Sequence, residues 1–299
     1  MSLPMLVNSV PQISKATLLQ QSRTVPCCFF RKQTRRASSA SSSTGATVTN
    51  ATMNAPRQEQ MSPTQVFKRQ WEIYQVILDG DYLEHKALYG ALQQYLHRKA
   101  ASRPLRLLDL GCGDSDYISR VIEECGGRAL VASYTGVDLS APAMEISKEN
   151  IHRALKGTDQ AEWHTADFLS FATSCQEEYD CILMSFAMHH LTSNEKAEIL
   201  VQCHRLLQNS GGAFLMVDIM RQPDETLTDY HVRSQRDVDH NWVGLTPEAR
   251  APFTDHMLKY DFPETFDLLE SISKAAGFKN VTILHAASKG ISQCLALES

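Results

Sequence analysis

Residues 107–116, LLDLGCGDSD, join an apolar run to a short turn that holds two glycines. The run that leads into this turn, 105–110, has the length and composition of a buried β-strand. A strand, a glycine turn and a following helix place free backbone N–H groups at the start of that helix, where a ligand can approach the backbone closely. The stretch therefore predicts a ligand site at the end of the first strand of an α/β fold.

Outward from this stretch, segments with strand and helix character alternate. Residues 63–100 predict helices that end before Pro104, and further helices are expected at 117–127, 141–156, 194–208 and 262–278. Such alternation is typical of parallel βαβ units that are buried on both faces. The last two strands are joined by a short turn that contains SKG, and we therefore expect them to be antiparallel. The seven strands expected are 105–110, 134–140, 161–168, 179–188, 213–220, 279–287 and 292–299.

The first 58 residues differ in composition from the rest of the chain. They hold seven basic residues and no Asp or Glu, and they are rich in Ser and Thr. This is the composition of an organelle transit peptide, and the hydroxyl residues throughout favour a plastid over a mitochondrion. The alternative is a disordered tail that carries no targeting signal. We therefore expect a disordered, transit-peptide-like tail at 1–60 and a single domain at 61–299.

The remainder of the chain is acidic, with 22 basic and 34 acidic residues and thus a net charge of −12. An acidic body disfavours nucleic acid as a partner, because neutralising phosphates requires a basic face. No apolar run approaches the roughly 18 residues that a membrane span needs. The eight cysteines form no CxxC pair and predict reduced thiols. The oligomeric state is left open.

The glycine turn also indicates which ligand it holds. A dinucleotide fingerprint reads G-x-G-x-x-G, but Asp116 stands where the third glycine is expected. Asp109 adds a second carboxylate just before the turn. Two acids beside the loop disfavour a pyrophosphate, and with it a nucleotide-dependent oxidoreductase, and they favour a ligand that carries a cationic group.

These residues resemble motif I of the class I S-adenosylmethionine-dependent methyltransferases, and the resemblance extends in register from about 105 to 295. Four later stretches of the chain resemble the further motifs of this family, in the order GVDLS, TADF, YDCILMSFAMHHL and LLQNSGGAFLMVD. The resemblance implies a Rossmann-like methyltransferase fold, with a mostly parallel seven-stranded sheet that ends in an antiparallel hairpin strand and has helices on both faces. It implies that Asp138 holds the ribose hydroxyls and that Asp167 and Phe168 lie at the adenine. The implied contacts to S-adenosyl-L-methionine are Asp109, Gly111, Cys112, Gly113, Asp138, Leu139, Asp167, Phe168 and Ser185.

The resemblance leaves the substrate half undefined. It implies in-line methyl transfer to a small or medium-sized molecule, since no N-P-P-Y run follows the fourth strand. We expect the substrate pocket between a helical cap, 61–104, and a polar insertion, 221–262, that acts as a lid and carries the apolar anchors Tyr230, Trp242 and Phe253. The alternative is a non-catalytic cofactor-binding or regulatory subunit with the same fold.

The catalytic residues are not assigned from the sequence. His189 and His190 are the candidates, because they follow the fourth strand at the edge where open α/β sheets bind ligands; the alternative is that they only pack or form hydrogen bonds. Arg233 and Arg236 are candidates to anchor a substrate carboxylate. No metal site is predicted. The histidines of the segment 221–260, namely His231, His240 and His256, lack metal-ligand spacing and are expected at the surface. The aromatic residues Trp71, Tyr74 and Tyr82 are expected in the core.

Overall fold

The computed structural model describes residues 63–157 and 159–299, so the tail predicted at 1–60 lies outside the described residues. Within this part of the chain, seven strands form one mixed sheet in the order β3-β2-β1-β4-β5-β7-β6. Only β7 runs antiparallel to its neighbours, β5 and β6, which confirms the predicted C-terminal hairpin. The strands are β1 (Leu105–Leu110), β2 (Val131–Asp138), β3 (Ala161–Thr165), β4 (Cys181–Ser185), β5 (Ala213–Ile219), β6 (Asn280–Ala286) and β7 (Ser292–Glu298).

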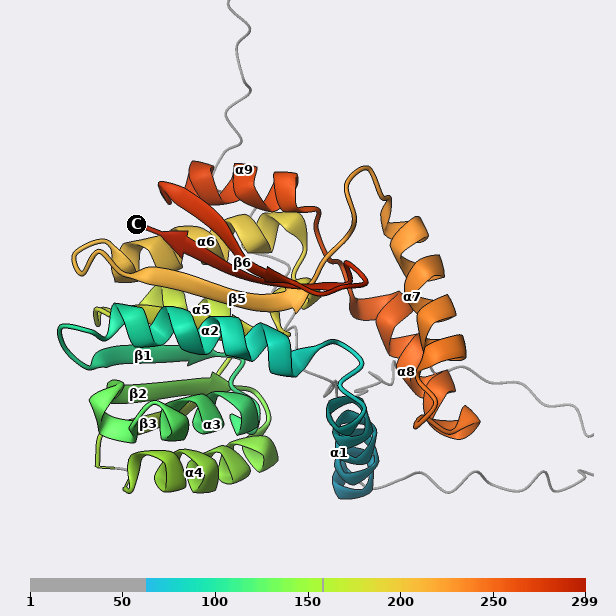
Figure 1. Cartoon of the computed structure of the whole chain (residues 1–299), viewed down its shortest axis with the longest axis horizontal. Coiled ribbons are helices and arrows are strands. Elements are labelled where there is room, and N and C mark those ends of the chain that lie inside the picture. The colour runs from blue at the N-terminus through green and yellow to red at the C-terminus, as the bar shows by residue number, and fades with distance from the viewer. Residues whose placement is uncertain (1–62, 158) are drawn as a thin grey trace, which may run out of the picture.

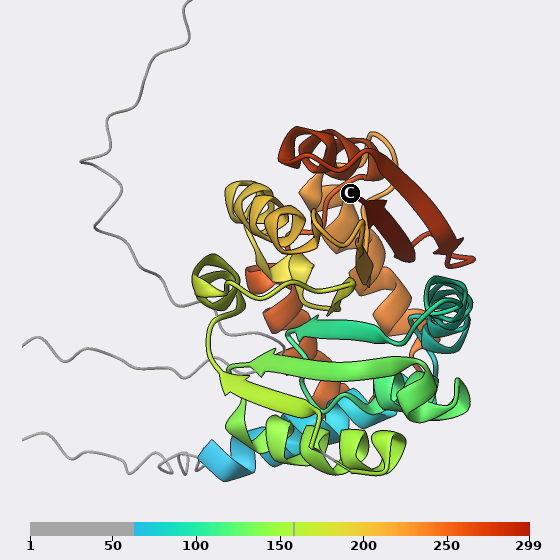
Figure 2. The same cartoon turned by 90° about the vertical axis from the view of Figure 1, so that its left-hand side faces the viewer.

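Helices cover both faces of the sheet (Figures 1 and 2). One apolar core lies under α5, α6 and α9, and a second lies under α2, α3 and α4. No described helix has both the length and the apolar content that crossing a bilayer requires. The helices are α1 (Pro63–Asp79), α2 (His85–Lys99), α3 (Asp116–Glu124), α4 (Ala141–Leu155), α5 (Phe168–Ser174), α6 (Ser193–Leu207), α7 (Leu227–Asn241), α8 (Pro247–Tyr260) and α9 (Phe266–Ala276), with short 3₁₀ turns η1 (Gly127–Ala129) and η2 (Met188–His190).

Local sequence accounts for where these elements begin. The β1 run is buried except for Arg106, as expected of a central parallel strand. Ser140 caps α4 by accepting a hydrogen bond from the backbone N–H of Ala143. Thr226 and Asp229 form a capping box at the start of α7. These caps mark where α4 and α7 begin, near the end of the sheet where the ligand site is expected.

The segment 221–260 is more ordered than its polar composition indicated. It forms the two helices α7 and α8, which lie beyond the carboxyl ends of the strands together with α1 (Figure 1). Val238 and Trp242 of α7 pack against Ile73 and Ile77 of α1 in a small separate core. The sparse apolar residues of this segment therefore find their partners on the N-terminal helix α1.

Candidate active site

The glycine turn after β1 is tied to the end of β2. Gly111 and Gly113 have φ angles of +76° and +50°, a conformation that disfavours side chains with a Cβ. The backbone N–H of Gly111 donates to the carbonyl of Val137 at 2.8 Å, and the N–H of Gly113 donates to Asp138 Oδ2 at 2.9 Å. The turn and the acid at the end of β2, predicted as one ligand site, therefore form one unit.

Three buried carboxylates surround this turn. Burial raises the pKa of Asp109 to about 7, although the hydroxyl of Tyr134 donates to its Oδ2 at 2.9 Å. Burial also raises the pKa of Asp138 to about 6, although the backbone N–H groups of Ser140 and Gly113 donate to it. Burial raises the pKa of Asp114 to about 6 as well. Each carboxylate is costly to ionise here, so a cationic ligand would stabilise the ionised forms.

A large cavity begins at this turn and extends under α1, α7 and α8. Its empty volume is about 1420 Å³, with open solvent at its mouth included. Most residues predicted for the site line this cavity, namely Asp109, Gly111, Cys112, Gly113, Asp138, Ser185, His189 and His190.

Three residues predicted to contact the cofactor do not line the cavity. Phe168 is 1% exposed and packs into the core under α5, which contradicts a place beside the adenine ring. The carboxylate of Asp167 instead caps α5, accepting from the backbone N–H of Ser170 at 2.8 Å. Leu139 is half-buried outside the cavity wall. The two arginines considered as anchors for a substrate carboxylate do not line the cavity either: Arg233 pairs with Glu225 at 2.6 Å, and Arg236 is exposed.

The aromatic walls of the cavity come from segments far apart in the sequence. Trp71 and Tyr74, expected in the core, line the cavity from α1, because helical spacing does not distinguish a core face from a pocket face. The predicted anchors Tyr230, Trp242 and Phe253 line it from α7 and α8. The cavity wall also includes His85, Asp114, Tyr117 and Tyr89, the last with its hydroxyl 2.6 Å from that of Ser185; no sequence motif indicated these four.

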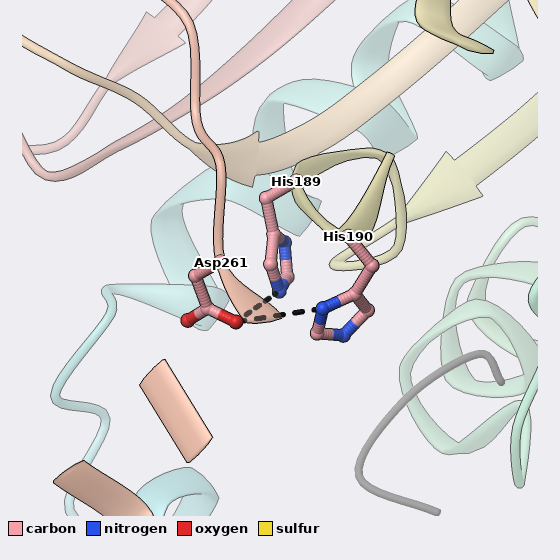
Figure 3. Close-up of side chains that lie close together, drawn as sticks. All are labelled: His189, His190 and Asp261. Atoms are coloured by element: carbon pink, nitrogen blue, oxygen red, sulfur yellow. Dashed lines mark ion pairs between the residues drawn. The ribbon is translucent and has the colours of Figure 1, made fainter. Parts of the chain in front are cut away.

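A polar cluster lies at the acceptor end of the cavity (Figure 3). His189 belongs to η2, and its Nδ1 lies 2.5 Å from Asp218 Oδ1 at the end of β5. The other ring nitrogen, Nε2, lies 3.6 Å from Asp261 Oδ1. His190 Nδ1 lies 3.4 Å from the same oxygen, and His256 Nε2 lies 3.9 Å from it. Three imidazoles therefore surround one carboxylate oxygen.

Backbone contacts hold this cluster together. The N–H of Phe262 donates to the carbonyl of His189 at 2.7 Å, and this bond fastens the segment after α8 to the end of β4. Burial lowers the pKa of His189 but Asp218 and Asp261 raise it, with a net increase. Burial lowers the pKa of His256 to about 4. The expectation of a surface position was wrong for His256, because α8 turns it inward.

Comparison with known proteins supports the fold and the motif. Residues 107–211 match the family model of a methyltransferase domain. An uncharacterised methyltransferase from Bacillus mycoides is 24% identical over 145 residues, which cover 48% of this chain and 61% of the relative. Another from Anoxybacillus flavithermus is 25% identical over 147 residues, covering 49% and 62%. The chain thus spans about three fifths of the length of the curated relatives it matches.

Two solved structures share the fold. The magnesium protoporphyrin IX methyltransferase of Synechocystis PCC 6803, with bound SAH, has a TM-score of 0.51 at 14% identity and covers 78% of this chain and 93% of that one. The plantazolicin methyltransferase BpumL, in complex with SAH, has a TM-score of 0.53 at 14% identity and covers 77% and 90%. Residues 107–211 thus match a methyltransferase domain, and the two solved methyltransferases share the fold of the chain.

Proposed function

We propose that the protein transfers the methyl group of S-adenosyl-L-methionine to a small or medium-sized molecule. The observation that carries this proposal is the shared cavity: the motif residues Asp109, Gly113 and Asp138 line one end, and the helices α1, α7 and α8 enclose the other. Transfer from a sulfonium needs in-line alignment of acceptor, methyl and sulfur in a site shielded from water. One continuous cavity with two chemically different ends meets that need.

The cofactor end suits a cation. Asp109, Asp114 and Asp138 are buried carboxylates, and S-adenosyl-L-methionine carries a sulfonium and an ammonium group. The carboxylate of Asp138 accepts one backbone N–H at each oxygen and still has lone pairs for the ribose hydroxyls. The sulfonium and ammonium groups would lower the cost of ionising these acids.

Beside the polar cluster, the acceptor end is lined by apolar and aromatic side chains. Among the described residues, no lysine or arginine lines the cavity, so it lacks the basic face that binding a nucleic-acid backbone requires. This supports a small acceptor that is neutral or cationic and argues against nucleic acid. Aromatic side chains such as Trp242 and Phe253 offer flat apolar surfaces to it. The polar atom that receives the methyl group would face the cofactor.

The proposal is tested by calorimetry and by methyl transfer. Calorimetry should show saturable binding of S-adenosylmethionine and S-adenosylhomocysteine and none of NAD. Tritiated S-adenosylmethionine incubated with a metabolite extract should label an extractable small molecule. Phe253→Ala should slow this labelling without weakening cofactor binding, whereas Leu258→Ala, on the same helix but 44% exposed, should change neither. Tight cofactor binding without transfer to any extract would instead support the non-catalytic subunit.

We also propose that the protein works in an organelle, with a plastid favoured. The support is the basic, acid-free and hydroxyl-rich composition of residues 1–58.

A further inference from the structure

We propose that the polar cluster at the acceptor end of the cavity binds one divalent first-row transition metal ion, such as Zn²⁺, through His189, His190 and Asp261. One ligand atom from each of these residues lies within 4.8 Å of the others, and all three residues are buried (Figure 3). Two imidazoles and a carboxylate are a ligand set that such ions take, with a further position left for water or substrate. Metal binding needs neither cofactor nor acceptor, so the inference is independent of the proposed methyl transfer.

The first support is the spacing of the donor atoms. In a tetrahedral site with metal–ligand bonds of about 2.0–2.1 Å, neighbouring donor atoms lie roughly 3.3–3.4 Å apart. Asp261 Oδ1 lies 3.4 Å from His190 Nδ1 and 3.6 Å from His189 Nε2. A shift of a few tenths of an ångström therefore suffices for these two pairs.

The second support is the state of the Asp261 carboxylate. Its Oδ1 is buried and has no hydrogen-bond partner among the described residues, although it is surrounded by ring nitrogens. A buried carboxylate oxygen in this state is costly, and native structures generally satisfy such atoms with a hydrogen bond or an ion. A metal ion at the centre of the cluster would bond to it directly.

The third support is the orientation of His189. Its Nδ1 lies 2.5 Å from Asp218 Oδ1, and its backbone N–H donates to Asp218 Oδ2 at 3.1 Å. A proton on Nδ1 shared with this carboxylate leaves the lone pair on Nε2, the nitrogen that faces Asp261. A carboxylate behind a histidine ligand is the usual way in which proteins orient it and raise its basicity.

The ion would replace a proton at His190. The Nδ1 of His190 lies 3.1 Å from the backbone carbonyl of Tyr260, which can accept a hydrogen bond from the Nδ1–H in the metal-free protein. Metal binding displaces the proton from the ligand nitrogen. Two carboxylates, Asp218 and Asp261, then balance the charge of the dication. His256 stands beside the site, with its Nε2 3.9 Å from Asp261 Oδ1.

The rival arrangement contains a proton instead of a metal ion, with His189 as an imidazolium between Asp218 and Asp261. Titration of the purified, EDTA-treated full chain with Co²⁺ separates the two. We expect one equivalent to bind, with visible bands of nitrogen and oxygen coordination, no thiolate charge-transfer band, and displacement by Zn²⁺. An absence of saturable binding, or a thiolate band that assigns the ion to the cysteines, would overturn the proposal.

Variants locate the ion. Asp261→Asn and His190→Gln should weaken Co²⁺ binding at least about 100-fold, and Asp218→Asn, behind the ligand, about 10- to 100-fold. His152→Gln, an exposed histidine on α4, should bind as the natural protein does. Unchanged affinity in folded Asp261→Asn and His190→Gln refutes the assignment. If these variants fail to fold, the natural protein still decides: its Co²⁺ form should show two exchangeable, paramagnetically shifted imidazole N–H signals, and their absence counts against the site.

Discussion

Replacing Asp109 with asparagine should make the protein more stable at high pH and lower its affinity for the cofactor. The carboxyl group is 2% exposed, and burial raises its pKa from 3.8 to about 7. The folded protein therefore holds a proton on Asp109 that the unfolded chain has lost between about pH 4 and pH 7. Stability contributed by this group falls as the pH rises through that window, and the loss is complete above pH 7.

The magnitude follows from the shift in pKa. A difference of about 3 units corresponds to about 4 kcal/mol at most, since each unit is worth 1.36 kcal/mol. An asparagine carbonyl can still accept the hydrogen bond from Tyr134, but its amide N–H groups need acceptors, which costs about 1 kcal/mol. We expect Asp109→Asn to be about 1 kcal/mol less stable than the natural protein at pH 4 and about 3 kcal/mol more stable at pH 8.

Urea unfolding from pH 4 to pH 8 measures this difference, and calorimetry at pH 8 measures cofactor binding. Loss of the charge should weaken S-adenosylmethionine binding by about tenfold or more. Asp180→Asn is the contrasting variant. Burial raises the pKa of Asp180, but hydrogen bonds from Arg103 and Arg106 lower it further, with a net decrease. Asp180 is therefore stabilised in its ionised form, and this variant should lose stability at neutral pH. A stability difference for Asp109→Asn that does not change with pH would refute the reasoning.

Three further predictions address the cofactor, the lid and the tail. Asp138→Ala should weaken S-adenosylmethionine binding by at least about tenfold, because two charge-assisted hydrogen bonds are lost, and unchanged calorimetric affinity in the folded variant would remove Asp138 from the site. Lys196 is buried on α6 and contacts Glu264 and the carbonyl of Phe262 in the segment after α8, so Lys196→Met should destabilise the protein by about 3 kcal/mol in urea unfolding. The double variant Lys196→Met/Glu264→Gln should recover part of that loss, and full additivity of the two changes would contradict the pairing. Residues 1–60 fused to a fluorescent protein should enter an organelle, and a cytosolic fusion would refute the proposed location.

The sequence by itself determined the order of the strands along the chain and the cofactor end of the site. The strand run 105–110, the glycines after it and Asp138 are close in sequence to the elements that position them, and a parallel sheet brings the carboxyl ends of β1 and β2 to one edge. The antiparallel hairpin followed from the short turn that contains SKG. Such features depend on local geometry, which residue type and spacing encode directly.

Only the tertiary structure shows which residues come together at the acceptor end of the cavity. The sequence indicated His189 and His190 as candidates. Their neighbours Asp218, Asp261 and His256 lie on other elements, and no local sequence pattern predicts that these side chains come into contact. A similar reason explains Phe168, which the resemblance placed at the adenine and the structure places in the core. Contacts between distant segments depend on how helices pack over the sheet, and many different residues satisfy that packing, so the sequence pattern does not specify them.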